Sequence, residues 1–173
     1  KLNGVSKKYY DNGKLEWEYA YVNDKLNGTS KEYYEDGKIN REATYSNGKL
    51  SGASKEYYED GTLKSVLMYA NDKKEGLAKW YYENGKLKQE EPYANGLIDG
   101  ILKNYYDSGK IQQEESYTKG VRNGTAKKYY ESGILKWEIS YVNGMKHGTE
   151  KVYLESGVLD FKNEYFNGEL VNW

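Results

Sequence analysis

Tyrosine and aliphatic residues are interspersed with charged and polar ones in short runs along the whole chain, and glycine-containing pairs separate the runs. Between 28 and 51, a run over 29–35 is followed by Asp36-Gly37, and a run over 38–46 is followed by Asn47-Gly48. Asp-Gly and Asn-Gly readily accept the positive φ of tight hairpin turns. The pattern therefore predicts two short antiparallel strands in this segment. No run has helical periodicity, so no helix is predicted.

This segment is one of seven tandem repeats of 24 residues. The clearest column is Gly4, Gly28, Gly52, Gly76, Gly100, Gly124 and Gly148, and further columns begin at Lys7, Tyr10, Gly13, Leu15, Glu18 and Tyr21. The repeats are 4–27, 28–51, 52–75, 76–99, 100–123, 124–147 and 148–171. We predict an all-β fold, an elongated single-layer antiparallel sheet of seven β-hairpin repeats forming one domain over 1–173. Because the chain opens without Met and closes within a repeat, we expect it to be a fragment.

A two-residue turn at Asp36-Gly37 would place Lys31 opposite Glu42 and Tyr34 opposite Ile39. The same arithmetic gives the pairs Lys7–Glu18, Lys79–Glu90, Lys103–Glu114 and Lys127–Glu138, with Lys55 facing Val66 and Lys151 facing Lys162. Opposite charges across a strand pair contribute about 0.2–1 kcal/mol each and oppose register slips. A three-residue loop with a glycine bulge would instead shift the pairing by one residue. The single proline, Pro92, is expected at a bulge.

Composition fits a thin sheet rather than a thick aliphatic core. Hydrophobic residues make up 37% of the chain, and 21 tyrosines can cover a sheet face while their hydroxyls stay in water. The net charge of −1 gives no general attraction to nucleic acid. The absence of cysteine excludes disulfides, cysteine-ligated zinc and a thiol nucleophile. No apolar run has the length of a transmembrane helix or a signal peptide, and the compartment stays open.

Three motifs recur along the chain: Asn-Gly-Lys-Leu-x-Gly, Tyr-Tyr-x-x-Gly-x-Leu and Glu-x-x-Tyr. Their clearest copies lie at 47–52, 57–63 and 42–45. Over its whole length the chain resembles the bacterial variant of the MORN repeat. The resemblance implies a solenoid of successive antiparallel hairpins, curved or twisted into a groove, that serves as a scaffold for contacts with proteins or membranes. It implies no shared catalytic residues, and some bacterial members are described as antitoxins of toxin–antitoxin pairs.

The residues themselves give no catalytic, cofactor-binding or metal-binding site. His147 is the only histidine, and we interpret it as a surface turn residue. One exposed histidine cannot supply a Ser-His-Asp arrangement. The carboxylates of the repeated columns face lysines or lie at turns, and neither a glycosidase pair nor a calcium loop stands out. We therefore expect a protein that is not an enzyme and needs no cofactor.

Specificity should lie where the columns vary, because the constant columns build the scaffold. One variable column holds Trp17, Arg41, Ser65, Gln89, Gln113, Trp137 and Phe161, and its expected cross-strand partners are Lys8, Glu32, Glu56, Trp80, Asn104, Lys128 and Val152. We call these two columns the variable stripe. Tryptophan and arginine dominate binding hot spots, so the expected partner-binding residues are Trp17, Arg41, Trp80, Trp137 and Phe161.

Two alternatives limit that interpretation. Trp17 over Lys8 and Trp137 over Lys128 would be local cation–π contacts that only cover the sheet. A second patch, Val66-Leu67-Met68, is core, a contact site or an association-prone surface.

Several functions remain open at this level. A scaffold that binds another protein, including an antitoxin-like inhibitor, fits a long surface that changes from repeat to repeat. A glycan-binding or cell-wall module would place a tryptophan in every repeat to build an aromatic cage, whereas the four tryptophans here do not share one column. A spacer role stays open. Membrane association is not expected, because glutamates neutralise the lysine column. Unpaired end strands would allow end-to-end self-association. The sequence favours the protein-binding scaffold.

Overall fold

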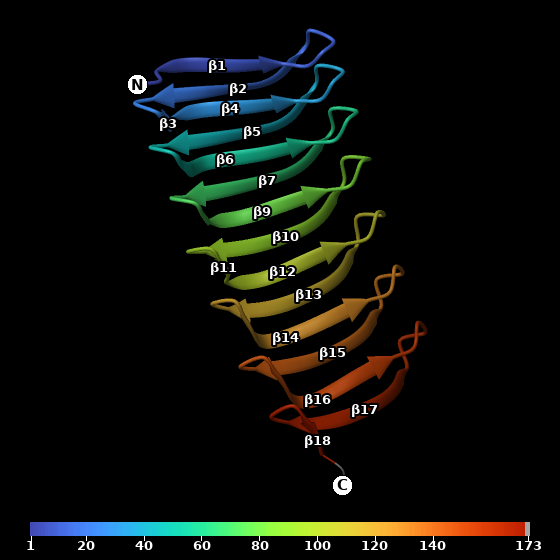
Figure 1. The fold of residues 1–173 in the computed structure, drawn as a ribbon. Helices are drawn as coiled ribbons and strands as arrows, with labels where there is room; N and C mark the ends of the chain where they lie inside the picture. Colours follow the sequence, from blue (N-terminus) through green and yellow to red (C-terminus); the bar gives the residue numbers. More distant parts are fainter. Residues whose placement is uncertain (172–173) are drawn as a thin grey trace. The chain divides into compact units, whose positions relative to one another are not determined.

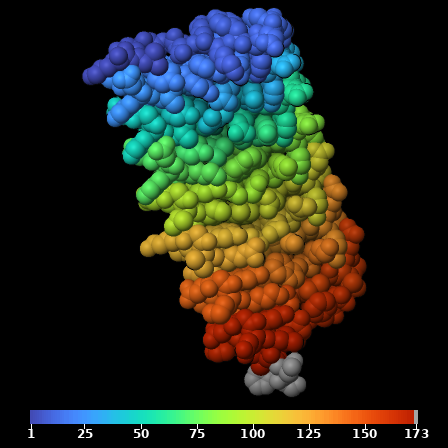
Figure 2. Space-filling view, in the orientation of Figure 1, coloured from blue at the N-terminus to red at the C-terminus, as the bar shows by residue number. Residues whose placement is uncertain are grey.

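The computed structural model describes residues 1–171, and these form strands and turns only. They fall into two compact units, which divide between Lys86 and Leu87. Within each unit, consecutive hairpins lie side by side in chain order in one antiparallel layer (Figure 1). The space-filling view shows the same order as successive bands of colour in each unit (Figure 2). The prediction of an all-β fold of tandem hairpins in open antiparallel sheet is confirmed.

The strands are short and repeat in the same order. The first unit contains β1 (Gly4–Tyr9), β2 (Leu15–Val22), β3 (Lys25–Leu26), β4 (Gly28–Tyr33), β5 (Ile39–Ser46), β6 (Lys49–Tyr57), β7 (Leu63–Ala70), β8 (Lys73–Lys74) and β9 (Gly76–Tyr81). The second contains β10 (Leu87–Ala94), β11 (Leu97–Ile98), β12 (Gly100–Tyr105), β13 (Ile111–Thr118), β14 (Val121–Tyr129), β15 (Leu135–Val142), β16 (Met145–Tyr153), β17 (Leu159–Phe166) and β18 (Glu169–Leu170).

The loop that follows the first strand of each repeat has three residues rather than two. In the second repeat, the amide of Tyr34 donates to the carbonyl of Lys38 at 2.8 Å, and the amide of Gly37 donates to the carbonyl of Tyr34 at 2.8 Å. Gly37 has a φ of 92°. These features define a turn closed by a glycine bulge. The predicted two-residue turn is therefore wrong, and Tyr34 pairs with Lys38 rather than with Ile39.

A second irregularity cancels the shift that this loop introduces. Tyr33 pairs with Ile39, but Glu32 pairs with Arg41, so Asn40 is an extra residue on its strand. One additional residue in the loop and one at the bulge return the rest of the hairpin to the predicted register. The same break recurs in the hairpins β1–β2, β6–β7, β12–β13, β14–β15 and β16–β17.

The pairs predicted for the lysine column are therefore confirmed in six hairpins, although the predicted turn was wrong. They include Lys7–Glu18, Lys31–Glu42, Lys103–Glu114 and Lys127–Glu138, together with the exceptions Lys55–Val66 and Lys151–Lys162. Each sheet has two faces, since alternate residues of a strand point to opposite sides. We call the face with the lysine and glutamate columns the ladder face, and the face with the variable stripe the stripe face.

The turns between repeats are two-residue hairpin turns with left-handed backbone. Asn47 and Gly48 have φ values of 51° and 84°, as a tight turn of this kind requires. Asp24 and Asp72 replace the glycine in two repeats, at φ values of 66° and 67°. The Asp72 carboxylate accepts a hydrogen bond from the amide of Leu50 at 2.8 Å, which offsets the backbone strain.

Most of the buried side chains lie in two columns of the stripe face, which small residues occupy in the first unit. These columns contain Ser30, Ala43, Ser54 and Ala78 in the first unit and Leu102, Glu115, Ala126, Ile139 and Glu150 in the second, and all of these are buried. The interior is thus one crowded layer rather than a thick aliphatic core, as the composition indicated.

Pro92 lies where the sheet pairing is interrupted. Tyr93 pairs with Ile98 of β11, whereas Glu90 pairs with Lys103 of β12, so Pro92 faces the break between these two strands. Its carbonyl accepts a hydrogen bond from the amide of Asp99 at 2.9 Å. Two residues of β10 face four residues of the partner strand here, so Pro92 lies opposite a bulge rather than within one.

Candidate interaction face

The two columns of the variable stripe lie side by side on one face within each unit. In the first unit, Lys8 pairs with Trp17, Trp17 with Glu32, and Glu32 with Arg41. The complete row across the first unit is Lys8, Trp17, Glu32, Arg41, Glu56, Ser65 and Trp80. In the second unit the row is Gln89, Asn104, Gln113, Lys128, Trp137, Val152 and Phe161. A constant backbone therefore presents a changing series of side chains.

Trp17 stacks on Tyr19 rather than on a lysine. The two rings are 4.5 Å apart between centroids and inclined by 18°. The ammonium of Lys8 lies 2.8 Å from the carboxylate of Glu16, the bulge residue of that hairpin. The predicted cation–π contact between Lys8 and Trp17 is therefore wrong, because the bulge places a carboxylate within closer reach of the lysine.

Arg41 is held in place by a small polar cluster. Its Nη1 lies 3.4 Å from Oε1 of Glu32, and the same oxygen accepts a hydrogen bond from the Tyr19 hydroxyl at 2.9 Å. Burial and the hydrogen bond to the Glu32 carboxylate raise the pKa of Tyr19 to about 12. The Arg41 side chain is 29% exposed. It therefore keeps an accessible cationic edge in a fixed orientation.

Trp80 and the neighbouring apolar patch close the first unit's row. The Lys74 ammonium lies 5.7 Å from the centroid of the Trp80 ring, a cation–π contact from a different strand. In the patch that the sequence singled out, Val66 and Leu67 are half-buried and Met68 is exposed. Val66 and Leu67 thus belong to the packing of the sheet, and only Met68 contributes to the surface.

Trp137 is anchored to a buried carboxylate, Glu150. Its indole N–H donates to Glu150 at 2.8 Å, and Lys146, Asn163 and Tyr165 donate to the same carboxylate at 2.7, 3.1 and 3.2 Å. Burial opposes ionisation of Glu150, but these donors outweigh it and lower its pKa to about 2. The expected contact of Trp137 with Lys128 is replaced by this network.

Beside Trp137 the row becomes apolar. Trp137 pairs with Val152, and Val152 pairs with Phe161. Phe161 is 47% exposed. All five residues predicted to bind a partner thus lie on the stripe face, with Trp17, Arg41 and Trp80 in the first unit and Trp137 and Phe161 in the second.

The second unit carries two further carboxylates on this face that the sequence analysis missed. Glu115 is buried and accepts hydrogen bonds from Gln113 at 2.6 Å, Tyr117 at 2.9 Å and Arg122 at 3.0 Å. Glu91 likewise accepts a bond from Gln89 at 2.7 Å. The spacing Gln-x-Glu-x-Tyr, present in both repeats, is the signal that could have revealed them.

His147 does not lie in a turn. It belongs to β16, is half-buried, and its ring lies 5.4 Å from that of Phe166. Its strand partner is Ser140, on the ladder face. The interpretation of His147 as a surface turn residue is wrong, because the strand extends through this position without the break seen at β11–β12.

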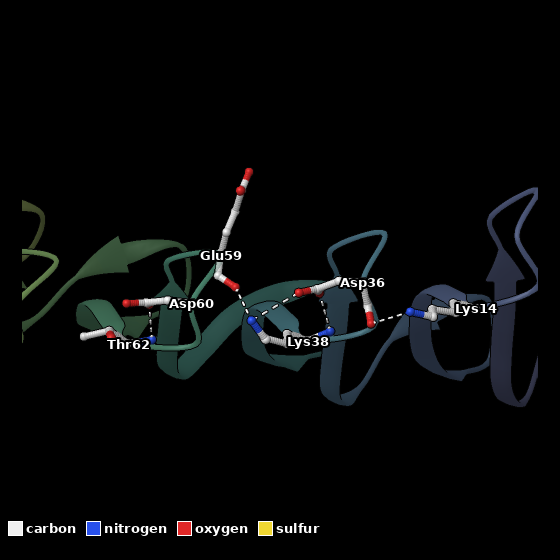
Figure 3. A network of polar contacts seen from close by, with 6 residues as sticks. All are labelled: Lys14, Asp36, Lys38, Glu59, Asp60 and Thr62. Carbon is white, nitrogen blue, oxygen red and sulfur yellow. Dashed lines mark hydrogen bonds and ion pairs between the residues drawn. The ribbon is translucent and has the colours of Figure 1, made fainter.

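The three-residue loops of the first unit are tied together along their edge (Figure 3). Lys14 Nζ donates to the carbonyl of Asp36 at 2.7 Å, and Lys38 Nζ donates to the carbonyl of Glu59 at 2.8 Å. The Asp36 carboxylate accepts the amide of Lys38, which lowers its pKa. The Glu59 side chain points away from these contacts in Figure 3. This edge joins neighbouring repeats.

Seven segments of the chain match a family model described as the MORN repeat variant. They are residues 2–23, 26–47, 50–71, 74–95, 98–119, 122–143 and 146–170. The chain belongs to the MORN repeat variant family. No curated protein matches the sequence. The MORN repeat fold is a non-enzymatic kind of domain and is consistent with a repeat scaffold.

Residues 1–171 contain no group of three or more His, Cys, Asp or Glu residues that could hold a metal ion. They also contain no helix long and apolar enough to cross a membrane.

Proposed function

We propose that this MORN repeat array is a non-catalytic scaffold that binds another protein through its stripe face. The observation that carries the proposal is the contrast between backbone and side chains in the stripe. The same register recurs in successive hairpins, while the side chains of the row include Lys, Trp, Glu and Arg in the first unit and change from amides to Trp, Val and Phe in the second. Such a surface can recognise a partner protein through the order of its side chains and needs no catalytic group to do so.

The first unit offers the best anchors for a partner. Trp17 is braced by Tyr19 and Arg41 by Glu32, so both are held in one conformation before binding. Pre-ordered aromatic and arginine side chains lose little conformational entropy on association. A partner with a carboxylate facing Arg41 and an apolar group facing Trp17 would complement this part of the row.

The second unit adds an apolar end to the same kind of surface. Trp137 is fixed by Glu150, and Val152 and Phe161 continue the row. The carboxylates on this face are bonded to neighbouring side chains, which suits a positioning role for them. We therefore infer that the chain has no enzymatic activity.

The proposal can be tested by capture of partners from an extract of the source organism. The wild-type array is compared with the variant Trp17→Ala/Arg41→Ala/Trp80→Ala/Trp137→Ala. A matched control carries four substitutions of exposed residues off the stripe, Val5→Ala/Leu77→Ala/Ile101→Ala/Thr125→Ala. Thermal unfolding of all three shows which of them remain folded.

The expected result is one or more proteins that wild type and control retain and the stripe variant loses. Equal capture by a folded stripe variant would exclude these residues as the binding site. If wild type retains no protein, the protein-binding proposal is contradicted, and a spacer or glycan-binding role takes its place.

A further inference from the structure

Large apolar side chains are exposed in a row along the Asn-Gly turn edge of the second unit. Between 41% and 62% of each is exposed, and they are Leu97, Val121, Val142, Met145 and Phe166. Val142 and Met145 are paired across the turn at 143–144. Val121 occupies the position equivalent to Met145 at the preceding turn, where it pairs with Thr118. Val142 follows Glu138 by four residues in β15, so the row lies on the ladder face, opposite the variable stripe. We call it the apolar edge.

The apolar edge is continuous from turn to turn. A Cβ built on Gly120 would lie 3.5 Å from Leu97 Cδ2, and one on Gly144 would lie 3.6 Å from Val121 Cγ1. Gly168 stands in the same relation to Met145, at 3.7 Å. Each turn therefore places a glycine beside the apolar side chain of the previous repeat, and no side chain at that position covers it.

The fold does not require apolar residues at this edge. In the first unit the column that contains Val121 and Met145 is occupied by Lys25, Lys49 and Lys73, and all three are exposed. The same turns form there with the same left-handed backbone. An exposed apolar row that the architecture does not need points to a contact with another molecule.

The backbone of the edge restricts the kind of partner. The amides of Gly120, Gly144 and Gly168 already donate to carbonyls of the preceding repeats, at 2.7 to 2.8 Å. An added β-strand gains its affinity from free main-chain groups, which these turn amides do not offer. A helix satisfies its own backbone groups and needs only side-chain contacts.

The spacing also fits a helix. Equivalent residues of successive hairpins are two strands apart, about 9.6 Å. Seven residues of an α-helix rise about 10.5 Å. Val121, Val142, Met145 and Phe166 follow one another on the successive strands β14 to β17, about 4.8 Å apart. The first and fourth positions of successive heptads alternate along a helix at rises of about 4.5 and 6 Å, which is close to this spacing.

Charges at the edge give the helix a direction. Lys119 lies in the turn nearer Leu97, and Glu169 pairs with Phe166 at the far end. Both are exposed. A helix carries partial positive charge at its N-terminus and partial negative charge at its C-terminus. Its N-terminus would therefore lie beside Glu169 and its C-terminus beside Lys119.

We propose that the apolar edge of the second unit binds an amphipathic α-helix of a partner protein, with apolar residues at the first and fourth positions of successive heptads. This surface is separate from the stripe face, so the array would hold two partners, or two parts of one partner, on opposite faces. The two proposals can fail independently of each other.

The test uses a synthetic 21-residue helical peptide with Leu at the first and fourth positions of three heptads and Ala, Glu and Lys elsewhere. A peptide of the same composition with leucines distributed around the helix is the control. Binding of each, below the concentration at which it self-associates, is measured by fluorescence anisotropy. The proteins are wild type, Val121→Lys/Met145→Lys, which copies the lysines of the first unit, and Phe161→Lys, which alters the stripe face.

We expect wild type and Phe161→Lys to bind the heptad peptide with equal Kd, and Val121→Lys/Met145→Lys to bind it at least about tenfold more weakly. A nitroxide at the peptide N-terminus should broaden amide signals near Glu169 more than those near Lys119. The proposal is overturned if wild type does not bind the heptad peptide or binds the control peptide equally well. It is also overturned if the lysine variant, shown to be folded by thermal unfolding, binds as well as wild type.

Discussion

At the scale of single residues, Gly124, which opens the sixth repeat, meets two demands at once. Gly124 has a φ of 109°, and a Cβ there would lie 2.9 Å from the Cβ of Ser116 on the neighbouring strand. Gly133, in a three-residue loop, has a φ of 94° but no heavy atom within 4 Å of the same added carbon. Backbone strain acts at both positions, whereas crowding acts only at Gly124.

Gly124→Ala should therefore destabilise the protein more than Gly133→Ala does. We expect Gly133→Ala to cost about 1 kcal/mol for its backbone conformation, and Gly124→Ala to cost about 2–3 kcal/mol because the strand must also shift. Urea unfolding of both variants measures the difference. Equal losses would show that Ser116 moves aside at no cost.

Glu150 links stability to pH, since its folded pKa of about 2 is below the ordinary value of 4.5. Between these values the unfolded chain binds a proton that the folded chain does not, so stability rises with pH. The contribution is complete above about pH 5 and disappears as pH falls through 2. The difference between the two pKa values corresponds to roughly 3 kcal/mol for this buried group.

We expect Glu150→Gln to unfold more readily than wild type at pH 7 and to lose less further stability between pH 5 and pH 2. Denaturant unfolding at several pH values gives both slopes. Glu155→Gln, which changes an exposed loop carboxylate, is the control and should follow wild type. Parallel profiles for Glu150→Gln and wild type would contradict the role assigned to this network.

At the scale of the hairpin, the tyrosine doublet of the second repeat connects it to both of its neighbours. Tyr33 donates to Glu18 of the preceding repeat at 2.9 Å, and Tyr34 donates to the carbonyl of Tyr57 in the following repeat at 2.6 Å. The second bond recurs at Tyr10, Tyr58, Tyr106 and Tyr130. The two tyrosines of the doublet thus bond to different repeats, because adjacent residues near the loop point toward different neighbours.

Tyr106→Phe should remove one hydrogen bond between repeats and cost about 0.5–1.5 kcal/mol. Tyr153→Phe is the matched control, because within residues 1–171 the Tyr153 hydroxyl makes no hydrogen bond and its loss should change stability by less than about 0.5 kcal/mol. Thermal unfolding of the two variants distinguishes the cases. Equal effects would mean that the tyrosine column is retained for its ring alone.

At the scale of the whole molecule, contacts are local in sequence. The strand pairs within each unit join a hairpin to itself or to the next hairpin along the chain. Arrays of this kind have stabilities that are sums of repeat and neighbour contributions, so they open in parts.

Hydrogen exchange of Gly124→Ala should therefore show lost protection mainly around β13 to β15, while amides of Lys1–Lys86 exchange as in wild type. The amide exchange rates, followed by mass spectrometry of peptic fragments, test this directly. A uniform increase along the chain would instead show that both units unfold as one cooperative body.

The repeat length, the all-β fold, the register of the lysine and glutamate columns and the assignment of the stripe to one face follow from the sequence. They depend on the residues that form tight turns and on the alternation of strand side chains between the two faces of a sheet. Both patterns occur in seven repeats of this sequence. The lysine–glutamate pairs could be predicted without the tertiary structure, since the cross-strand partners in a hairpin are found by counting residues outward from its turn.

Other features were decided only by tertiary structure. The three-residue loop shifts the pairing by one residue, and the bulge at Asn40 shifts it back. The charge pairs farther along the strands are therefore the same with or without both features, and they could not reveal either. The anchoring of Trp137 by Glu150 and the stacking of Trp17 on Tyr19 depend on which neighbour a flexible side chain reaches first. The apolar edge is also a feature of the tertiary structure, because the exposure of its side chains depends on how neighbouring repeats pack and not on the sequence of any single repeat.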